Sequence, residues 1–381
     1  MRFPEFCEEW MRCTLGDITE NFSRRNKEEI HYPMFSVTNN KGFIPQSEQF
    51  EDREMIGEDI KAYKIIHKDD FAYNPARINV GSIAKYNEEN PCMISSLYVC
   101  FKTNPKIDND WMMQLLKTPK MNFYYNINGE GGVRIYLFYP NFARIKTSYP
   151  TLKEQQKISS FLTLLDERIS TQNKIIEDLK KLKVAITQKI SKDKSNKKVM
   201  LSELLTERCE KNKDLYPVHS VSVSEGIINQ IDYLGRSFAA NDISNYNVVY
   251  YGDIVYTKSP TGDFPYGIVK MNSINAKVSV SPLYGVYHPS SEYVGIYLHN
   301  YFSNSLNAKN YLHKLIQKGA KNTINITNKR FLENEISLPN EALLKEYSLF
   351  ISTFDLKIKS EQKAQLLLQK QKEYLLQQMF I

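Results

Sequence analysis

The feature that most constrains this chain is residues 151–190, which have the pattern of one long amphipathic helix. Positions spaced alternately by four and three residues are mostly apolar, as in the seam of a coiled coil. At 1.5 Å per residue this helix would be about 58 Å long, so we expect it to act as a spacer as well as a connector. The seam consists of Ile158, Leu162, Leu165, Ile169, Gln172, Ile176, Leu179, Lys183, Ile186 and Ile190. A stripe of this length requires a partner helix, because it is not stable in water.

The same seam recurs 189 residues later, at the end of the chain. Its positions are Tyr347, Ile351, Phe354, Ile358, Glu361, Gln365, Leu368, Lys372, Leu375 and Met379. Both copies interrupt the apolar pattern at the same places, Gln172/Glu361 and Lys183/Lys372. The sequence therefore predicts two homologous halves, each ending in a helix that pairs with the helix of the other.

The segments that precede the two helices also match each other in order. Residues 32–37 correspond to residues 216–221, and residues 70–73 correspond to residues 253–256. Short runs rich in Tyr, Phe and Val alternate with polar turns, which is typical of strands, and Asp110–Leu116 gives the clearest helical pattern in the first segment. A repeat of nearly 190 residues far exceeds solenoid periods of about 20 to 50, so it indicates domain duplication.

The predicted fold class is α+β, with two homologous mixed α/β domains separated by two long helices that pair with each other as a coiled coil. Thr151 and Glu154 are placed to form a capping box, and Asn340 is placed to cap the last helix. The polar, basic stretch between the halves is predicted to be a hinge. The predicted boundaries are 1–149 for the first domain, 150–192 for the central helix, 193–198 for the hinge, 199–338 for the second domain and 339–381 for the C-terminal helix.

Charge and cysteine content narrow the class of protein. With 50 Lys and Arg against 43 Asp and Glu, the net charge is +7, which suits a polyanionic partner without requiring one. The five cysteines include no C-x-x-C pair, so we expect reduced, intracellular thiols. We also expect no leader and no membrane span, because the first residues are acidic and no run of about 18 apolar residues occurs. These features predict a soluble, cytoplasmic protein.

Motifs for catalysis are incomplete or missing. Residues 74–77, Asn-Pro-Ala-Arg, begin like the Asn-Pro-Pro-aromatic motif of amino-methylating enzymes and then depart from it. No glycine is followed by lysine, which excludes a Walker A loop. Residues 59–61, Asp-Ile-Lys, resemble the end of a nuclease signature, but no matching acid precedes them at a convincing spacing. The histidines include no pair at metal-ligand spacing. We therefore predict a binding module without catalytic residues, metal or cofactor.

Polar loops at corresponding places in both halves are the candidate DNA-binding surfaces. Arg and Lys contact guanine or phosphate, Asn contacts adenine, and Ser or Thr suits either. Any single residue could instead be an ordinary solvated loop residue, so the hypothesis depends on the doubled arrangement. In the first half the candidates are Arg24, Arg25, Lys27, Asn40, Lys41, Asn74, Arg77, Asn79 and Arg134. In the second half they are Lys211, Lys213, Ser222, Lys258, Ser259, Thr261, Lys318, Lys321 and Asn322.

Two stretches of the central helix resemble a known family. They are residues 149–158, Tyr-Pro-Thr-Leu-Lys-Glu-Gln-Gln-Lys-Ile, and residues 161–169, Phe-Leu-Thr-Leu-Leu-Asp-Glu-Arg-Ile, the second of which has a copy at 350–358. With the order domain, helix, domain, helix, the chain is similar over its whole length to the DNA-specificity subunit of type I restriction-modification systems. Residues 341–346, Glu-Ala-Leu-Leu-Lys-Glu, depart from the family's Leu-x-Glu-Gln-x-x-Ile pattern.

The resemblance implies that the two domains are DNA-recognition domains, each reading one half of a split sequence in double-stranded DNA. It implies further that the two helices form an antiparallel coiled coil that sets the spacing. It also implies that type I methyltransferase subunits dock on the helices and bring S-adenosylmethionine, and that a restriction/translocase subunit joins the complex. One alternative is a coiled-coil scaffold with two protein-binding domains. A fragment of a fused type IIG restriction protein is another.

Overall fold

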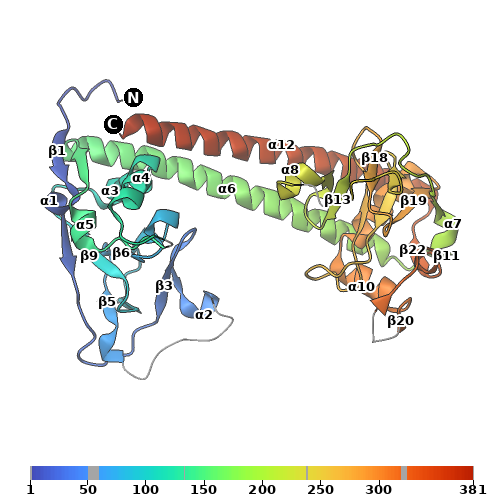
Figure 1. Cartoon of the computed structure of the whole chain (residues 1–381), viewed down its shortest axis with the longest axis horizontal. Helices are drawn as coiled ribbons and strands as arrows, with labels where there is room; N and C mark the ends of the chain where they lie inside the picture. The colour runs from blue at the N-terminus through green and yellow to red at the C-terminus, as the bar shows by residue number, and fades with distance from the viewer. Residues whose placement is uncertain (1, 50–59, 133, 237–238, 319–323, 381) are drawn as a thin grey trace. The chain divides into compact units, whose positions relative to one another are not determined.

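The computed structural model describes residues 2–49, 60–132, 134–236, 239–318 and 324–380. The chain divides into two compact units, one of Met1–Asn173 with Lys363–Ile381 and one of Lys174–Gln362 (Figure 1). Two long helices, α6 (Leu152–Ser191) and α12 (Glu341–Met379), each contribute one part to each unit. Each unit is therefore a globular domain with a pair of helix segments.

The first unit is built around antiparallel strands. Its strands are β1 (Met11–Thr14), β2 (Thr19–Phe22), β3 (Phe35–Thr38), β4 (Gly42–Pro45), β5 (Lys64–Ile66), β6 (Phe71–Tyr73), β7 (Ile83–Lys85), β8 (Cys92–Ile94), β9 (Val99–Thr103) and β10 (Lys146–Tyr149). The shorter helices are α1 (Leu15–Ile18), α2 (Gln46–Gln49), α3 (Asn109–Leu116), α4 (Pro119–Asn128) and α5 (Tyr139–Ala143), with 3-10 turns η1 (Ile60–Ala62) and η2 (Ile78–Val80). A four-stranded sheet has the order β2-β9-β6-β7, and the two-stranded sheets are β1-β10, β3-β4 and β5-β8.

The core of the first unit joins this sheet to the helix pair. Phe71 of β6 stacks on Phe101 of β9 with ring centroids 5.0 Å apart. Trp111 of α3 is fully buried and lies 5.8 Å from the ring of Phe380, just after α12. The predicted helix at 110–116 is confirmed as α3, and Leu162 of α6 is buried in the same core.

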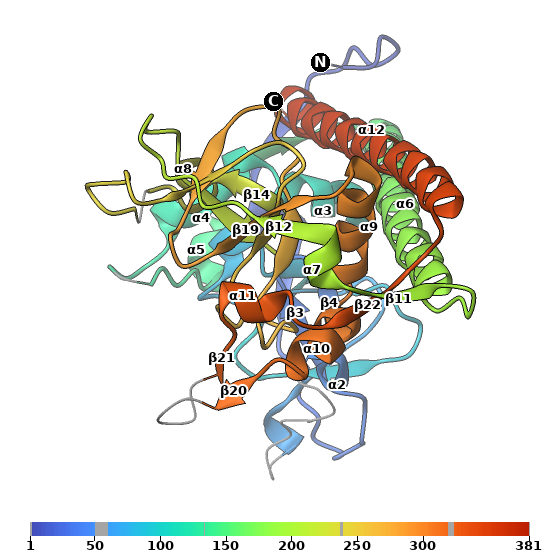
Figure 2. The same ribbon diagram turned by 90° about the vertical axis from the view of Figure 1, so that its right-hand side faces the viewer.

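The second unit, which faces the viewer in Figure 2, has a set of elements closely similar to that of the first unit. Its strands are β11 (Lys197–Met200), β12 (Leu205–Glu207), β13 (His219–Ser222), β14 (Gly226–Asn229), β15 (Asn247–Val249), β16 (Ile254–Tyr256), β17 (Val269–Met271), β18 (Val278–Val280), β19 (Gly285–Pro289), β20 (Gln317–Lys318), β21 (Ile324–Asn325) and β22 (Glu335–Leu338). The helices are α7 (Leu201–Leu204), α8 (Gln230–Leu234), α9 (Glu292–Phe302), α10 (Ser305–His313) and α11 (Asn328–Phe331). In its core, Tyr297 of α9 packs edge-on against Tyr347 of α12, with centroids 5.8 Å apart.

The topology of the first unit is repeated in the second. The four-stranded sheet has the order β12-β19-β16-β17, and the pairs β11-β22, β13-β14 and β15-β18 match β1-β10, β3-β4 and β5-β8. The predicted α+β class with two homologous domains and two long helices is therefore confirmed.

The long helices pair antiparallel within each unit, and every predicted seam position is buried or half-buried. In the first unit, Asp166 meets Lys372 at 2.5 Å and the amide of Asn173 meets that of Gln365. In the second unit, Thr187 and Tyr347 share a hydrogen bond of 2.8 Å between their hydroxyl groups. The heptad spacing predicted this interface correctly because it depends on local periodicity alone.

Two local predictions differ from the structure. The stretch 193–198 is not hinge throughout, because Lys197 and Lys198 begin β11 and pair with β22. Glu154 was expected to complete a capping box with Thr151, but its buried carboxylate accepts hydrogen bonds from Arg2, with the Nη2 bond 2.6 Å long, and from Trp10. Both differences arise from contacts with distant segments. The predicted cap at Asn340 is present, since its Oδ1 accepts from the backbone N–H of Leu343 at 2.9 Å.

Candidate nucleic-acid interface

A groove with a volume of about 620 Å³ opens in the first unit between the β3–β4 hairpin and the turn after β6. It brings together four of the predicted DNA-binding residues, Asn40 and Lys41 from the hairpin turn with Asn74 and Arg77 from the other turn. Lys41 and Arg77 are exposed. The other lining residues are Ser36, Val37, Thr38, Asn39, Ile44, Gln46, Glu48 and Tyr98. The groove thus offers cationic, amide and hydroxyl groups, the kinds that contact base edges and phosphates.

The two loops of this groove are fastened to each other. Ser82 donates a 2.7 Å hydrogen bond from its hydroxyl to the backbone carbonyl of Val37. Gly81 has φ +99°, and a Cβ there would lie 3.2 Å from the carbonyl oxygen of Asn39, so the close approach favours glycine. Asn74 holds its own turn, because its Oδ1 accepts from the backbone N–H two residues on at 3.0 Å. Contacts within the chain therefore hold the two loops that form the groove.

One hydrogen-bonded pair of hairpin residues, present in both units, was not predicted from the sequence. In the first unit Gln46 Nε2 donates to Ser36 Oγ at 3.3 Å, and in the second Gln230 Nε2 donates to Ser220 Oγ at 3.3 Å. Ser36 and Ser220 occupy matching places in the repeat, which was an available signal. Gln46 and Ser36 also line the groove.

Arg24 has a different environment from Arg77. Its Nη1 lies 2.9 Å from Oδ2 of Asp70, whose side chain is 9% exposed, and its guanidinium lies 4.7 Å from the ring centroid of Phe22. The same carboxylate accepts the backbone N–H of His67 at 2.8 Å. Arg24 therefore neutralises a carboxylate that holds the turn before β6, a structural role the sequence did not predict.

The remaining first-unit candidates are not among the residues that line this groove. Arg25 and Lys27 are exposed on the loop after β2. Asn79 donates to the side-chain oxygen of Asn126 on α4 at 3.1 Å. Arg134 is exposed in the loop after α4.

In the second unit the candidates are more scattered. Lys211 donates to Asn247 Oδ1 at 2.8 Å and Lys213 is exposed, whereas Ser222 is buried in the hairpin. Ser259 and Thr261 are exposed in the turn after β16, and burial lowers the pKa of nearby Lys258. Lys318 ends β20, while Lys321 and Asn322 lie outside the described residues. The structure thus brings the first-half candidates together more closely than the second-half ones.

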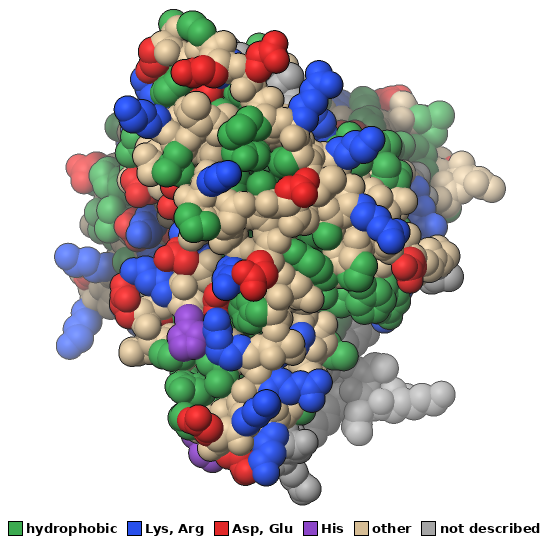
Figure 3. Space-filling model, turned by 90° about the vertical axis from the view of Figure 1, so that its left-hand side faces the viewer, with side chains coloured by type: hydrophobic (Ala, Val, Ile, Leu, Met, Phe, Trp, Pro, Cys, Tyr) green, Lys and Arg blue, Asp and Glu red, His purple; other side chains and the backbone are tan. Residues whose placement is uncertain are grey.

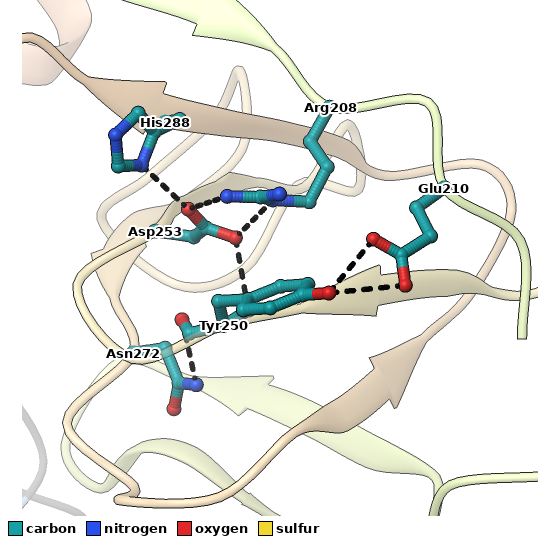
Figure 4. A network of polar contacts seen from close by, with 6 residues as sticks. All are labelled: Arg208, Glu210, Tyr250, Asp253, Asn272 and His288. Atoms are coloured by element: carbon teal, nitrogen blue, oxygen red, sulfur yellow. Dashed lines mark hydrogen bonds and ion pairs between the residues drawn. The ribbon is translucent and has the colours of Figure 1, made fainter. Parts of the chain in front are cut away.

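A polar network holds the turn before β16 (Figure 4). The fully buried carboxylate of Asp253 accepts from Arg208 Nε at 2.7 Å and Nη2 at 3.1 Å, and this bonding raises the pKa of Arg208. Arg208 also lies 4.1 Å from the ring centroid of Tyr250, whose hydroxyl donates to Glu210 at 3.0 Å. His288 approaches the same carboxylate at 3.4 Å. Since Asp253 corresponds to Asp70, both units use an arginine to neutralise the aspartate of this turn.

Surface charge, metal-ligand geometry and the apolar character of the helices add three observations. On the face shown in Figure 3, lysines and arginines are interspersed with carboxylates and apolar side chains, so positive charge does not form one continuous patch there. Within the described ranges, no group of three His, Cys, Asp or Glu side chains is arranged to hold a metal ion. None of the helices described here is long and apolar enough to cross a membrane.

Comparison with known sequences finds a family that matches the first half of the chain. Residues 7–181 match the family described as the type I restriction modification DNA specificity domain. A curated relative, the putative type I restriction enzyme MjaX specificity subunit of Methanocaldococcus jannaschii, is 26% identical over 198 residues. That match covers 49% of this chain and 46% of the relative, so the chain spans about half the length of the curated relative that it matches.

Two solved structures share the fold over nearly the whole chain. One comes from work on complex assembly and conformational transition of the type I R-M system, and it matches with a TM-score of 0.59 and 12% identity over 99% of this chain and 98% of that chain. The other is the S subunit of a type I restriction-modification system from M. genitalium, with a TM-score of 0.57 and 12% identity over 98% of this chain and 96% of that chain. At this identity the likeness shows the fold alone.

Proposed function

Because residues 7–181 match the family described as the type I restriction modification DNA specificity domain, we propose that this chain is the DNA-recognition subunit of a type I restriction-modification complex. Each unit reads one half of a bipartite, asymmetric site in double-stranded DNA. The paired helices set the spacing between the halves and dock the methyltransferase subunits.

The observation that carries this proposal is a repeated framework with unlike loops. Both units have the same sheet order, but Asn39, Asn40 and Lys41 in the first hairpin turn are replaced by Val223, Ser224 and Glu225 in the second. Two domains with the same fold but different loop side chains suit a DNA site with two different halves.

In the first unit the groove is the proposed reading surface. Arg77 is exposed and suits bidentate contact with guanine, while Asn40 and Asn74 suit adenine. Lys41 suits a phosphate contact, which positions the protein without specifying sequence.

Apolar side chains on the outside of the helices support the docking of partner subunits. In the first unit Leu164 of α6 is 64% exposed and Phe161 is 39% exposed. In the second unit Leu349 and Leu356 of α12 are 73% and 69% exposed, and Phe350 lies beside them at 47%. Of these residues, Phe161 and Phe350 occupy matching places in the repeat. Exposed apolar side chains grouped on a helix are typical of protein interfaces.

We further propose that this chain catalyses nothing itself. The groove presents amide, hydroxyl and cationic groups, with Glu48 as its one carboxylate among the lining residues, and this set suits binding rather than acid–base chemistry. The methyltransferase subunits bring S-adenosylmethionine, and a restriction/translocase subunit completes the complex.

The experiment is to express the chain with its methyltransferase partner in a host that lacks both, and to map modified bases in the genome. The proposal predicts a new bipartite motif with unlike halves, absent when either gene is omitted. Methylation that persists without this chain, or binding of the chain to the partner with no effect on the methylated sequence, would favour a protein-binding scaffold instead.

A further inference from the structure

A second cavity, within the second unit, is lined by an excess of cationic groups. It has a volume of about 490 Å³ and lies among α6, α12, α9, β17 and the β13–β14 turn. Lys180, Lys183, Lys270 and Lys359 line it. Two carboxylates, Asp355 and Glu225, also line the cavity. Asp355 is already paired with Lys183, with Nζ 2.6 Å from Oδ1.

Lys270 is the unusual member of this group, because it is only 6% exposed. Its ammonium donates to the hydroxyl of Ser303 at 3.3 Å, and in the described part of the chain no carboxylate lies within ion-pair distance of it. Buried charges are normally paired, since removing an ammonium from water without a counter-charge is costly. Lys270 therefore lacks a counter-charge that the cavity has room to hold.

His299, on α9 next to this lysine, supplies a neutral donor. Burial, together with Lys270 and Lys183, lowers the pKa of His299 to about 3. Its Nδ1 is 3.1 Å from the backbone nitrogen of Met271, and a backbone N–H can only donate. The neutral ring therefore carries its proton on Nε2. Thr187 also lines the cavity.

We propose that this cavity binds a phosphate-type oxyanion, with the ammonium of Lys270 as its main partner and His299 and Lys183 beside it. A tetrahedral dianion supplies the missing counter-charge and accepts several hydrogen bonds at once, which matches the surplus of donors. The bound ion joins β17, α9 and the two long helices, so it stabilises the attachment of the second recognition domain to its helix segments. The site is separate from the groove proposed to read DNA, and its occupancy does not depend on DNA recognition.

The proposal is tested by calorimetric titration of the full chain with inorganic phosphate, in a chloride buffer free of sulfate and phosphate and at constant ionic strength. One phosphate should bind per chain and raise the melting temperature of the second unit. Lys270→Met should weaken binding by at least about tenfold, the loss expected for one charge-assisted hydrogen bond. Lys309→Met, which removes an exposed lysine on α10, should bind as the unaltered chain does.

Lys270→Arg retains the positive charge and should keep most of the affinity for phosphate. This variant shows whether Lys270→Met weakens binding because the charge is lost or because the protein is misfolded. A parallel titration with adenosine monophosphate identifies the source of the anion, since tighter binding than inorganic phosphate indicates a nucleotide and weaker binding indicates the free ion. Equal phosphate binding by the unaltered chain and Lys270→Met, or no binding at about 10 mM phosphate, would overturn the proposal. Phosphate that is displaced only by an acidic segment of a partner subunit would also overturn it, by assigning the cavity to a protein contact.

Discussion

Lys183 and Asp355 face each other across the two long helices of the second unit, with Nζ 2.6 Å from Oδ1. In the first unit Lys372 and Asp166 make the corresponding contact at 2.5 Å. The two pairs are related by the same shift of 189 residues that relates the two seams. The lysine that interrupts each seam is therefore matched by an acid on the other helix. These ion pairs favour one register because slippage by a heptad separates lysine from aspartate.

The Lys372–Asp166 pair should show a measurable coupling energy. Lys372→Glu and Asp166→Lys should each destabilise the first unit by about 1 kcal/mol, and the double exchange should recover much of that loss. Denaturant unfolding of the four proteins gives the coupling. A control pair is Lys357 and Glu361, one turn apart on α12, which should couple by no more than about 0.5 kcal/mol. If the changes in unfolding free energy caused by the two substitutions simply add, the Lys372–Asp166 pair does not set the register of the helices.

Arg77 and Arg24 should respond differently to replacement by alanine. Arg77→Ala should leave the melting temperature unchanged and weaken binding to the cognate DNA by about 1 to 3 kcal/mol, relaxing specificity only in the first half-site. Arg24→Ala should lower the melting temperature, because it leaves the buried carboxylate of Asp70 without its cation. Arg144→Ala, at an exposed position after α5, serves as the control. Affinity that is unchanged in Arg77→Ala would mean that the reading surface lies elsewhere in the first unit.

The sequence predicted the helices and their pairing, as well as the family resemblance, because a seam is a local, periodic signal. It did not predict the roles of Arg24 or Glu154. Their partners, Asp70 and Arg2, are 46 and 152 residues away, and nothing local marks such a pair. The site of Lys270 was missed for a similar reason, since a lysine in a short strand gives no sign that a hairpin and two helices will cover it. In the first unit four of the predicted DNA-binding loop residues do meet in one groove. In the second unit, loop composition alone could not show which of the candidates lie together.

Raising the pH should stabilise the unaltered chain relative to Lys270→Met. Burial, assisted by Lys183, lowers the pKa of Lys270 from 10.5 to about 8. Between these values the unfolded chain binds more protons than the folded chain, so stability rises with pH across this window. In phosphate-free buffer the buried ammonium of Lys270 lowers the free energy of unfolding below pH 8. About 2 to 3 kcal/mol of this loss should be recovered by pH 10 to 10.5. Urea unfolding of both proteins at pH 7 and pH 10 measures this. A difference in stability that is the same at both pH values would show that the lysine is not charged and desolvated in the fold.

The spacing between the two half-sites should follow the length of the helices. One heptad inserted after Lys174 and its partner heptad after Lys363 keeps both seams in phase and adds about 10 Å. The mapped site should then gain about three base pairs in its spacer, at 3.4 Å per pair, with both half-sites unchanged. An unaltered spacer in the modified-base map would show that the helices do not set the distance.

A chain truncated after Lys198 should form a dimer, because the first unit loses the part of α12 that completes its core. The matching part of α6 from a second copy can replace it, and Asp166 can then pair with Lys183 of that copy. Two apolar core contacts become polar in this exchange, so the dimer should be weaker than the natural pairing. The replacements are Ile186 for Leu375, Thr187 for Leu376, Ile190 for Met379 and Ser191 for Phe380. Thr187→Leu combined with Ser191→Phe should therefore tighten the dimer.

The most direct test of the account is the DNA sequence that this truncated chain selects with the methyltransferase partner. Two interchangeable helices and two identical readers form a closed two-fold dimer. The map of modified bases should therefore show an inverted repeat of the original first half-site, and sedimentation should show a dimer. A target that keeps two unlike halves, or a well-folded monomer in sedimentation, would contradict the interchangeable-helix account of the repeat.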